Sequence, residues 1–426
     1  MHGRPEGAWL WWHPSGEKST EGSYAGGLEV GTWTWWNASG QKTTEGAYVL
    51  GEKVATWTQW HDDGTVKETA AYRAGKLHGP FRKWHPNGQL ATEATYLNGD
   101  LHSRYRSWHP QGQPHADGSY RKGRLHGRYK LLYPNGQIDV QTVFREGNHY
   151  GRVVTHFDNG TPGTESVYVD GKRHGLSRVW NAAGILKTEI EWAHGVRHGR
   201  TIWYGDDGKR KAVETYQGGL LEGPMEIWKD GVLTETSLYV AGKRHGPIVG
   251  FHLDGKQRAF EGSYRDGLRH GTWRQWAPDG RLLETAEFSR GDGTMVHYYP
   301  SAQRQSEHPM RRDKSHGVSR SWTADGKLFL EQTYYRGANH GPGVLYHDDG
   351  NLALRARYRF GQKHGLQLKY GAKGEVRQRE CFDRGRLLWK TRLSEKESLS
   401  TADSHDATEA TDVKAGKTCP ADENFD

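Results

Sequence analysis

The chain has 426 residues, of which 34% are hydrophobic, 12% are aromatic and 57 are glycine. The aromatic content argues against wholesale disorder, the glycines lack the every-third-residue period of collagen, and no apolar run is long enough for a transmembrane helix. The net charge is +8, yet the last 33 residues, from Ser394, hold nine acidic residues and three lysines. This distribution predicts a basic folded body and a disordered acidic tail over residues 394–426.

The cysteines and the first residues of the chain narrow the class of protein further. Cys381 and Cys419 are too few for a disulfide framework, and no CxxC metal motif is present. No apolar stretch follows Met1, so the sequence predicts no signal peptide, and a cytoplasmic location is weakly favoured.

A glycine recurs every 24 residues along the first half of the chain and continues at nearly the same spacing to Gly374. With Ala302 in place of one glycine, the series marks sixteen repeats: Gly16, Gly40, Gly64, Gly88, Gly112, Gly136, Gly160, Gly184, Gly208, Gly231, Gly255, Gly280, Ala302, Gly326, Gly350 and Gly374. A second glycine, usually preceded by His, runs in step with the first. An aromatic residue such as Trp36 follows it by five positions, and a Tyr such as Tyr48 closes the repeat.

One repeat reads as a β-hairpin. Residues 80–85 are aromatic-rich and too short for a stable helix, Asn87-Gly88 supplies the positive φ angles of a tight turn, and residues 89–97 favour a strand. Asn98-Gly99 turns the chain into the next repeat. The spacing of Trp33 and Trp36 indicates either a bulge or aromatic residues on both faces.

These features predict an all-β fold, an elongated, twisted, single-layer stack of about sixteen antiparallel β-hairpins over residues 1–393. Each hairpin contributes two strands and advances the sheet by about 9.6 Å. The Trp and Tyr columns would form a thin core between neighbouring hairpins.

The repeats resemble the MORN-repeat variant found in bacterial toxin–antitoxin repeat proteins, whose pattern is like G-K-x-H-G-x-W-x-x-[WY]-x-x-N-G-x-x-x-x-E-x-x-[YF]. The residues that carry the resemblance in two repeats are His78-Gly79, Trp84, Asn87-Gly88, Glu93 and Tyr96, and Lys172-Arg173-His174-Gly175, Trp180, Gly184, Glu189 and Trp192. The resemblance covers residues 1 to about 393. It implies stacked hairpins and a scaffold or binding role, linked in some family members to membrane lipids and in others to protein assembly.

Several repeats depart from this pattern. Ala55 and Ser103 replace the second glycine, and Asp313 replaces the glycine of the turn between repeats. The repeat over residues 291–309 is two residues short and lacks its turn glycine. One expectation is a local kink or a specialised site in this repeat. The other is an irregular repeat that has no special role.

Two recurring residue types could suggest chemistry. The column of histidines, one per repeat, cannot share a zinc ion because neighbours lie about 9.6 Å apart, so contact with turn backbone is the simpler reading. The column of glutamates lies just outside the spacing of glycosidase carboxylates and reads as cross-strand partners of Lys or Arg. The sequence therefore predicts no catalytic residue, no cofactor, no metal and no enzyme.

The aromatic columns allow one more function. Exposed aromatic ladders can stack sugars, bases or choline, and Gly31-Thr32-Trp33-Thr34-Trp35-Trp36 is superficially similar to choline-binding repeats. Most repeats keep one or two aromatic residues, which favours an intramolecular core.

Basic residues recur at the loop between hairpins and form the candidate binding stripe: Lys76, Arg124, Lys172, Arg173, Arg197, Lys243, Arg244, Arg269 and Lys363. The sequence predicts a non-enzymatic scaffold that binds a protein partner along an aromatic and basic β-surface. The alternative is a binding module for anionic lipid or cell-envelope polymer. Sequence-specific nucleic-acid binding is not expected, because a repeat edge offers no groove-reading helix.

Overall fold

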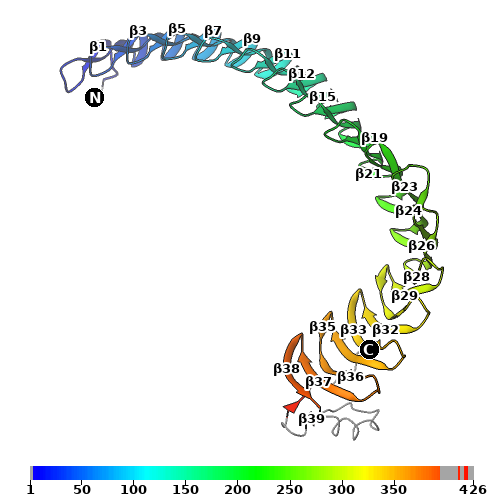
Figure 1. Cartoon of the computed structure of the whole chain (residues 1–426). Helices are drawn as coiled ribbons and strands as arrows, with labels where there is room; N and C mark the ends of the chain where they lie inside the picture. Colours follow the sequence, from blue (N-terminus) through cyan, green and yellow to red (C-terminus); the bar gives the residue numbers. More distant parts are fainter. Residues whose placement is uncertain (1–2, 394–410, 413–416, 421–426) are drawn as a thin grey trace. The chain divides into compact units, whose positions relative to one another are not determined.

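The computed structural model describes residues 3–393, 411–412 and 417–420 (Figure 1). All regular secondary structure in these residues is β, and strands β1 to β38 belong to an open antiparallel sheet. The predicted fold class, an all-β repeat of antiparallel hairpins, is confirmed.

The chain divides into two compact units. The first extends to Lys209 and includes Tyr216–Gly219, and the second comprises Arg210–Thr215 and the chain from Leu220 onward. The strands up to the first boundary are β1 (Gly7–Trp12), β2 (Lys18–Ala25), β3 (Leu28–Trp36), β4 (Lys42–Val49), β5 (Glu52–Trp60), β6 (Val66–Arg73), β7 (Lys76–Trp84), β8 (Leu90–Leu97), β9 (Asp100–Trp108), β10 (Pro114–Arg121), β11 (Arg124–Leu132), β12 (Ile138–Arg145), β13 (Asn148–His149), β14 (Gly151–His156), β15 (Pro162–Val169), β16 (Lys172–Arg173), β17 (Gly175–Trp180), β18 (Leu186–Ala193) and β19 (Val196–Tyr204).

The remaining strands are β20 (Arg210–Gln217), β21 (Leu220–Leu221), β22 (Gly223–Lys229), β23 (Val232–Val240), β24 (Lys243–Phe251), β25 (Arg258–Arg265), β26 (Leu268–Trp276), β27 (Leu282–Ser289), β28 (Asp292–Tyr298), β29 (Arg304–Arg311), β30 (Lys314–Ser315), β31 (Gly317–Trp322), β32 (Leu328–Tyr335), β33 (Ala338–Tyr346), β34 (Leu352–Arg359), β35 (Gln362–Lys363), β36 (Gly365–Tyr370), β37 (Val376–Asp383), β38 (Arg386–Arg392), β39 (Thr411–Asp412) and β40 (Lys417–Thr418).

Two turns alternate along the sheet. The long turn closes each hairpin, as where the His85 N–H donates to Gln89 O at 2.8 Å between β7 and β8. The short turn leads to the next hairpin and has two central residues with positive φ, such as Asn98 at 53° and Gly99 at 96°. This is the type I′ geometry that a right-handed strand twist favours. The Gly99 N–H donates to Leu77 O at 2.8 Å, beside the neighbouring short turn, so consecutive short turns are tied together.

Each repeat also contains two register shifts. The first follows the short turn, where Tyr72 pairs with Leu77 but Ala70 pairs with Phe81, so the β7 strand carries two extra residues around the second glycine, Gly79. The other lies at the long turn and, in the Trp33–Trp36 segment, falls between Trp35 and Trp36. Of the two readings of the Trp33 and Trp36 spacing, the bulge is confirmed.

The buried centre of the aromatic face is the first tryptophan position of the repeat pattern, and not the aromatic position five residues after the second glycine. It lies two residues after the second glycine and is occupied by Trp33 and Trp57, which are 4% and 5% exposed. The Trp57 ring lies over Gly46, where a Cβ atom would be 2.0 Å from the ring. Large side chains in this column therefore need glycine or alanine on the adjacent strand. By contrast, Trp12 of the expected aromatic column is 57% exposed.

The two cysteines form a disulfide, Cys381–Cys419, which the sequence analysis did not anticipate. Cys381 in β37 is fully buried, and Cys419 belongs to the predicted tail. The disulfide ties residues 417–420 to the last hairpins, and the Pro420 carbonyl lies beside Gly365. Most of the predicted tail falls outside the described residues.

Replacing Gly46 with alanine should destabilise the hairpins around β4 by about 1–3 kcal/mol, because the new methyl group overlaps the Trp57 ring. Adding Trp57→Phe recreates the pair that Ala70 and Phe81 form in the next hairpin, so the double variant should recover most of the loss. Urea unfolding followed by circular dichroism measures both effects. A Gly46→Ala variant as stable as the native chain would contradict the packing described.

Candidate functional site: the short-turn edge

The nine predicted basic residues all lie near short turns, but they occupy two different strand positions. Lys76, Arg124, Lys172 and Lys243 directly follow the turn glycine and pair with the residue before the turn. Arg173, Arg197, Arg244, Arg269 and Lys363 come one residue later and pair with a closing aromatic residue. Because consecutive strand residues point to opposite faces, the nine do not form one row.

The later set covers the aromatic face. The Arg173 guanidinium lies 5.2 Å from the Trp192 ring centroid, Arg269 lies 4.3 Å from Phe288, and Lys363 lies 5.0 Å from Phe382. Lys53, which was not among the predicted residues, does the same at 4.0 Å from Trp57. These cations pack on rings of their own chain, where they stabilise the single-layer core.

The earlier set contributes to a surface that we call the short-turn edge, made of the short turns and the residue pair that flanks each. Lys76 pairs directly with Arg73, and Arg124 pairs directly with Arg121 across Lys122. All five side chains are exposed and form no ion pair with the described residues. Like charges placed directly across a strand pair destabilise a sheet, so folding alone does not account for them.

Exposed apolar residues gather on the same edge. In the first unit they are Leu28, Val49, Leu50, Leu97, Val169 and Val196, and in the second Leu220, Val240 and Phe360. Leu50 occupies a turn centre with a φ of 50° and is 64% exposed. These apolar residues were not predicted from the sequence, because only the basic residues of the loops were compared between repeats.

The recurring glutamates are cross-strand partners, as expected. Glu93 accepts hydrogen bonds from Arg82 at 3.0 Å and from Arg106 on the other side. The hydrogen bond from Arg82 lowers the pKa of Glu93 below its usual range, despite partial burial. A carboxylate held between two guanidinium groups is a poor proton acceptor for catalysis.

The recurring histidines contact the next short turn, which confirms the structural reading. The Nδ1 atoms of His126, His270 and His340 accept hydrogen bonds of 3.3–3.5 Å from turn N–H groups. Each ring therefore links one bulge to the following turn. Among the described residues, no group of three His, Cys, Asp or Glu side chains could hold a metal ion.

The short repeat in the second unit has lost its bulge. The ladder between β27 and β28 runs without a register shift from Glu284↔His297 to Ser289↔Asp292, so the two missing residues are those that form the bulge elsewhere. Ala302 takes the place of the turn glycine with a φ of 63°, and its N–H donates to Tyr299 O at 2.9 Å. The long turn is thus preserved.

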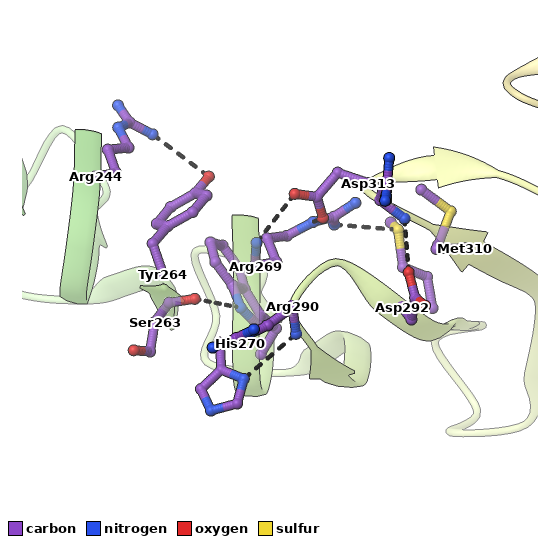
Figure 2. Close-up of polar contacts among 12 residues, drawn as sticks. Arg244, Ser263, Tyr264, Arg269, His270, Arg290, Asp292, Met310 and Asp313 are labelled. Carbon is purple, nitrogen blue, oxygen red and sulfur yellow. Dashed lines mark hydrogen bonds and ion pairs between the residues drawn. The ribbon is translucent and has the colours of Figure 1, made fainter. Parts of the chain in front are cut away.

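An ion pair spans this short repeat (Figure 2). The Asp313 carboxylate accepts hydrogen bonds from the Arg269 side chain at 2.8 Å and from the Arg269 backbone N–H at 3.0 Å. The two side chains are 17% and 24% exposed. Asp313 occupies a short-turn position that glycine fills elsewhere, with a φ of 60°. Asp313, which departs from the repeat pattern, therefore links the two sides of the hairpin that lacks a bulge. We call this Arg269–Asp313 contact the clamp.

A partly buried polar cluster lies near this clamp. Glu284 Oε2 lies 3.4 Å from His297 Nδ1, and His308 Nε2 lies 3.0 Å from Ser306 Oγ. Burial raises the pKa of Glu284 and lowers the pKa of His308, so both groups are shifted toward their neutral forms.

These features define a β-hairpin repeat protein with one strongly patterned edge. The family description "MORN repeat variant" matches residues 77–98 and 125–146. The match confirms the resemblance for these segments, which include His78–Tyr96, whereas the resemblance of Lys172–Trp192 stays a prediction. The toxin–antitoxin association of the variant stays a prediction. No curated protein matches the chain. The described residues include no helix long and apolar enough to cross a bilayer.

Solved structures give a weak likeness. Crystal structures of TcdB2-TccC3-Cdc42 and of TcdB2-TccC3 are each 10% identical, cover 88% and 89% of this chain and 26% and 27% of theirs, and have TM-scores of 0.12 and 0.13. The chain spans about a quarter of the length of these structures. Superpositions this poor carry no argument about function.

Replacing Asp313 with glycine restores the residue that other short turns carry but removes the acceptor of the Arg269 amide. Hydrogen bonds to charged groups contribute about 1.5–3 kcal/mol, so the Arg269 amide should exchange its hydrogen at least about tenfold faster. Asp313→Asn keeps an acceptor oxygen and tolerance of positive φ, and should give an intermediate rate. An unchanged Arg269 amide in Asp313→Gly would contradict the proposed clamp.

Proposed function

We propose that this protein is a non-enzymatic repeat scaffold that binds a protein partner carrying acidic residues along its short-turn edge. The observation that carries the proposal is an alternation of turn chemistry over four consecutive short turns of the first unit, from Val49 to Arg124. The turns at Val49–Glu52 and Leu97–Asp100 present apolar and acidic residues, whereas those at Arg73–Lys76 and Arg121–Arg124 present like-charged cation pairs.

The alternation has a defined spacing. Basic turns are separated by two hairpins, which is four strands or about 19 Å. A partner with acidic groups at that interval would relieve the repulsion within both cation pairs, and its apolar side chains would cover exposed residues such as Leu50 and Leu97. Interfaces of this kind combine exposed apolar anchors with charge complementarity, which provides specificity.

The acidic residues on the same edge favour a protein over a uniformly anionic surface. Glu52, Asp100 and Glu146 are exposed in the short turns that neighbour the basic turns. A membrane or cell-envelope polymer with negative charge everywhere would be repelled by these carboxylates, whereas a protein can match both signs. Binding to anionic lipid or polymer is therefore the alternative outcome of the test.

The double variant Arg73→Glu/Arg121→Glu separates folding from binding. Each change places a carboxylate opposite Lys76 or Arg124, so a repulsive pair becomes attractive and stability should rise by about 0.2–1 kcal/mol per turn. Affinity for an extended peptide with glutamate pairs six residues apart and leucines between them should fall at least about tenfold. Titration calorimetry at two salt concentrations measures the loss.

The control Arg128→Glu makes one such Arg→Glu change on an exposed strand position away from the short-turn edge. It should bind the peptide as the native chain does. Equal weakening by the control, or unchanged binding by the double variant, would count against the short-turn edge. Co-sedimentation with anionic vesicles in the absence of peptide binding would reject the protein partner and favour the alternative.

A further inference from the structure

The second unit contains a recess between two consecutive short turns. It has a volume of about 520 Å³ and is lined by Arg311, Arg312, Lys314, His316, Tyr335 and Arg336. Four of the six lining residues carry a permanent positive charge, and none is acidic. None of them belongs to the candidate binding stripe predicted from the sequence, and this turn lacks the usual glycine.

The first wall of the recess is the short turn from Arg311 to Lys314, which carries three positive charges. Arg311 pairs directly with Lys314, with Arg312 and Asp313 at the turn centre in positive φ. Asp313 could have neutralised these cations, but its carboxylate is bound to the side chain and backbone of Arg269 on the preceding hairpins (Figure 2). The clamp that stabilises the short repeat thus removes the one acid of this turn from the recess.

A second carboxylate near the turn is also engaged. Asp292 Oδ1 accepts a hydrogen bond of 2.8 Å from the Arg312 backbone N–H, which fixes the turn and leaves the Arg312 side chain free to face the recess. Among the described residues, neither Arg311, Arg312, Lys314 nor Arg336 forms an ion pair. Uncompensated charge of this density attracts anions.

The second wall adds a ring and a fourth cation. The Arg336 guanidinium lies 5.3 Å from the Tyr335 ring centroid, and the His316 ring lies 5.2 Å from Tyr335. Arg336 holds a turn-centre position with a φ of 51°, equivalent to that of Arg312 one hairpin earlier. Consecutive short turns therefore direct guanidinium groups into one concave site.

We infer that this recess binds a soluble oligophosphate, a diphosphate or longer. Guanidinium groups form paired, charge-assisted hydrogen bonds with phosphate oxygens, and four cations exceed what one phosphate monoester neutralises. A compact ligand can enter a recess between two turns, whereas a flat membrane surface contacts the rims. The site goes beyond the proposed function, because it concerns a small ligand and lies in the second unit.

The test measures pyrophosphate binding to the full chain by titration calorimetry at physiological ionic strength. The variant Arg312→Asn/Arg336→Asn removes two cations and keeps residues that tolerate positive φ. Its affinity for pyrophosphate should be at least about tenfold lower than that of the native chain. Lys122→Asn is the matched control: Lys122 has a φ of 51° between Arg121 and Arg124, but the neighbouring turns supply Asp100 and Glu146.

The control should bind pyrophosphate within about twofold of the native chain. Unchanged affinity in the double variant, or an equal loss in the control, would overturn the site. Equal affinity for sulfate and pyrophosphate would overturn the assignment to oligophosphate. Binding to vesicles with phosphomonoester headgroups, without binding of free pyrophosphate, would overturn a soluble ligand. Arg73→Glu/Arg121→Glu should retain pyrophosphate binding, so failure here is distinct from failure of the proposed function.

Discussion

The short turn between hairpins is the constraint on which the rest of the structure depends. Its two central residues adopt positive φ, which leaves the turn glycine N–H outside the ladder of its own strand pair. That N–H instead donates to a carbonyl beside the neighbouring short turn, as Gly99 does to Leu77 and Gly123 does to Leu101. Within each unit, this bond and the bulge histidine hold successive turns in register, so side chains near the turns recur at a fixed interval.

A single-layer sheet must cover its apolar side chains without a second sheet. The chain does so with a ring over glycine or alanine, as Trp57 over Gly46, and with a cation over the ring, as Lys53 over Trp57. Farther along, the same buried column holds small polar residues such as Ser177 and Thr201. A chain with few hydrophobic residues can therefore still be ordered, because each buried side chain is covered by residues of the two adjacent strands.

The period, both turns, the glutamate pairing and the histidine contacts could be predicted, because each depends on spacing within or between adjacent repeats. The position of Trp33 and Trp57 is the first tryptophan of the repeat pattern, but its burial was not predicted, because its residue type changes along the chain. The division of the nine basic residues follows from their distance to the turn glycine: Lys172 directly follows Gly171 and Arg173 comes one residue later, so the two point to opposite faces. The sequence could have shown this division, but the nine were treated as one row. Asp313 and the Cys381–Cys419 disulfide depend on contacts 44 and 38 residues apart, beyond one repeat.

Amide hydrogen exchange at the short-turn glycines tests this account most directly. In an isolated type I′ hairpin the N–H of this glycine would have no partner in the ladder and would exchange freely. If turns are tied to turns, the amides of Gly75, Gly99, Gly123 and Gly147 should exchange at least about tenfold more slowly than unprotected glycine, although all lie in turns. Unprotected exchange at these glycines, alongside protected strand amides, would contradict the account.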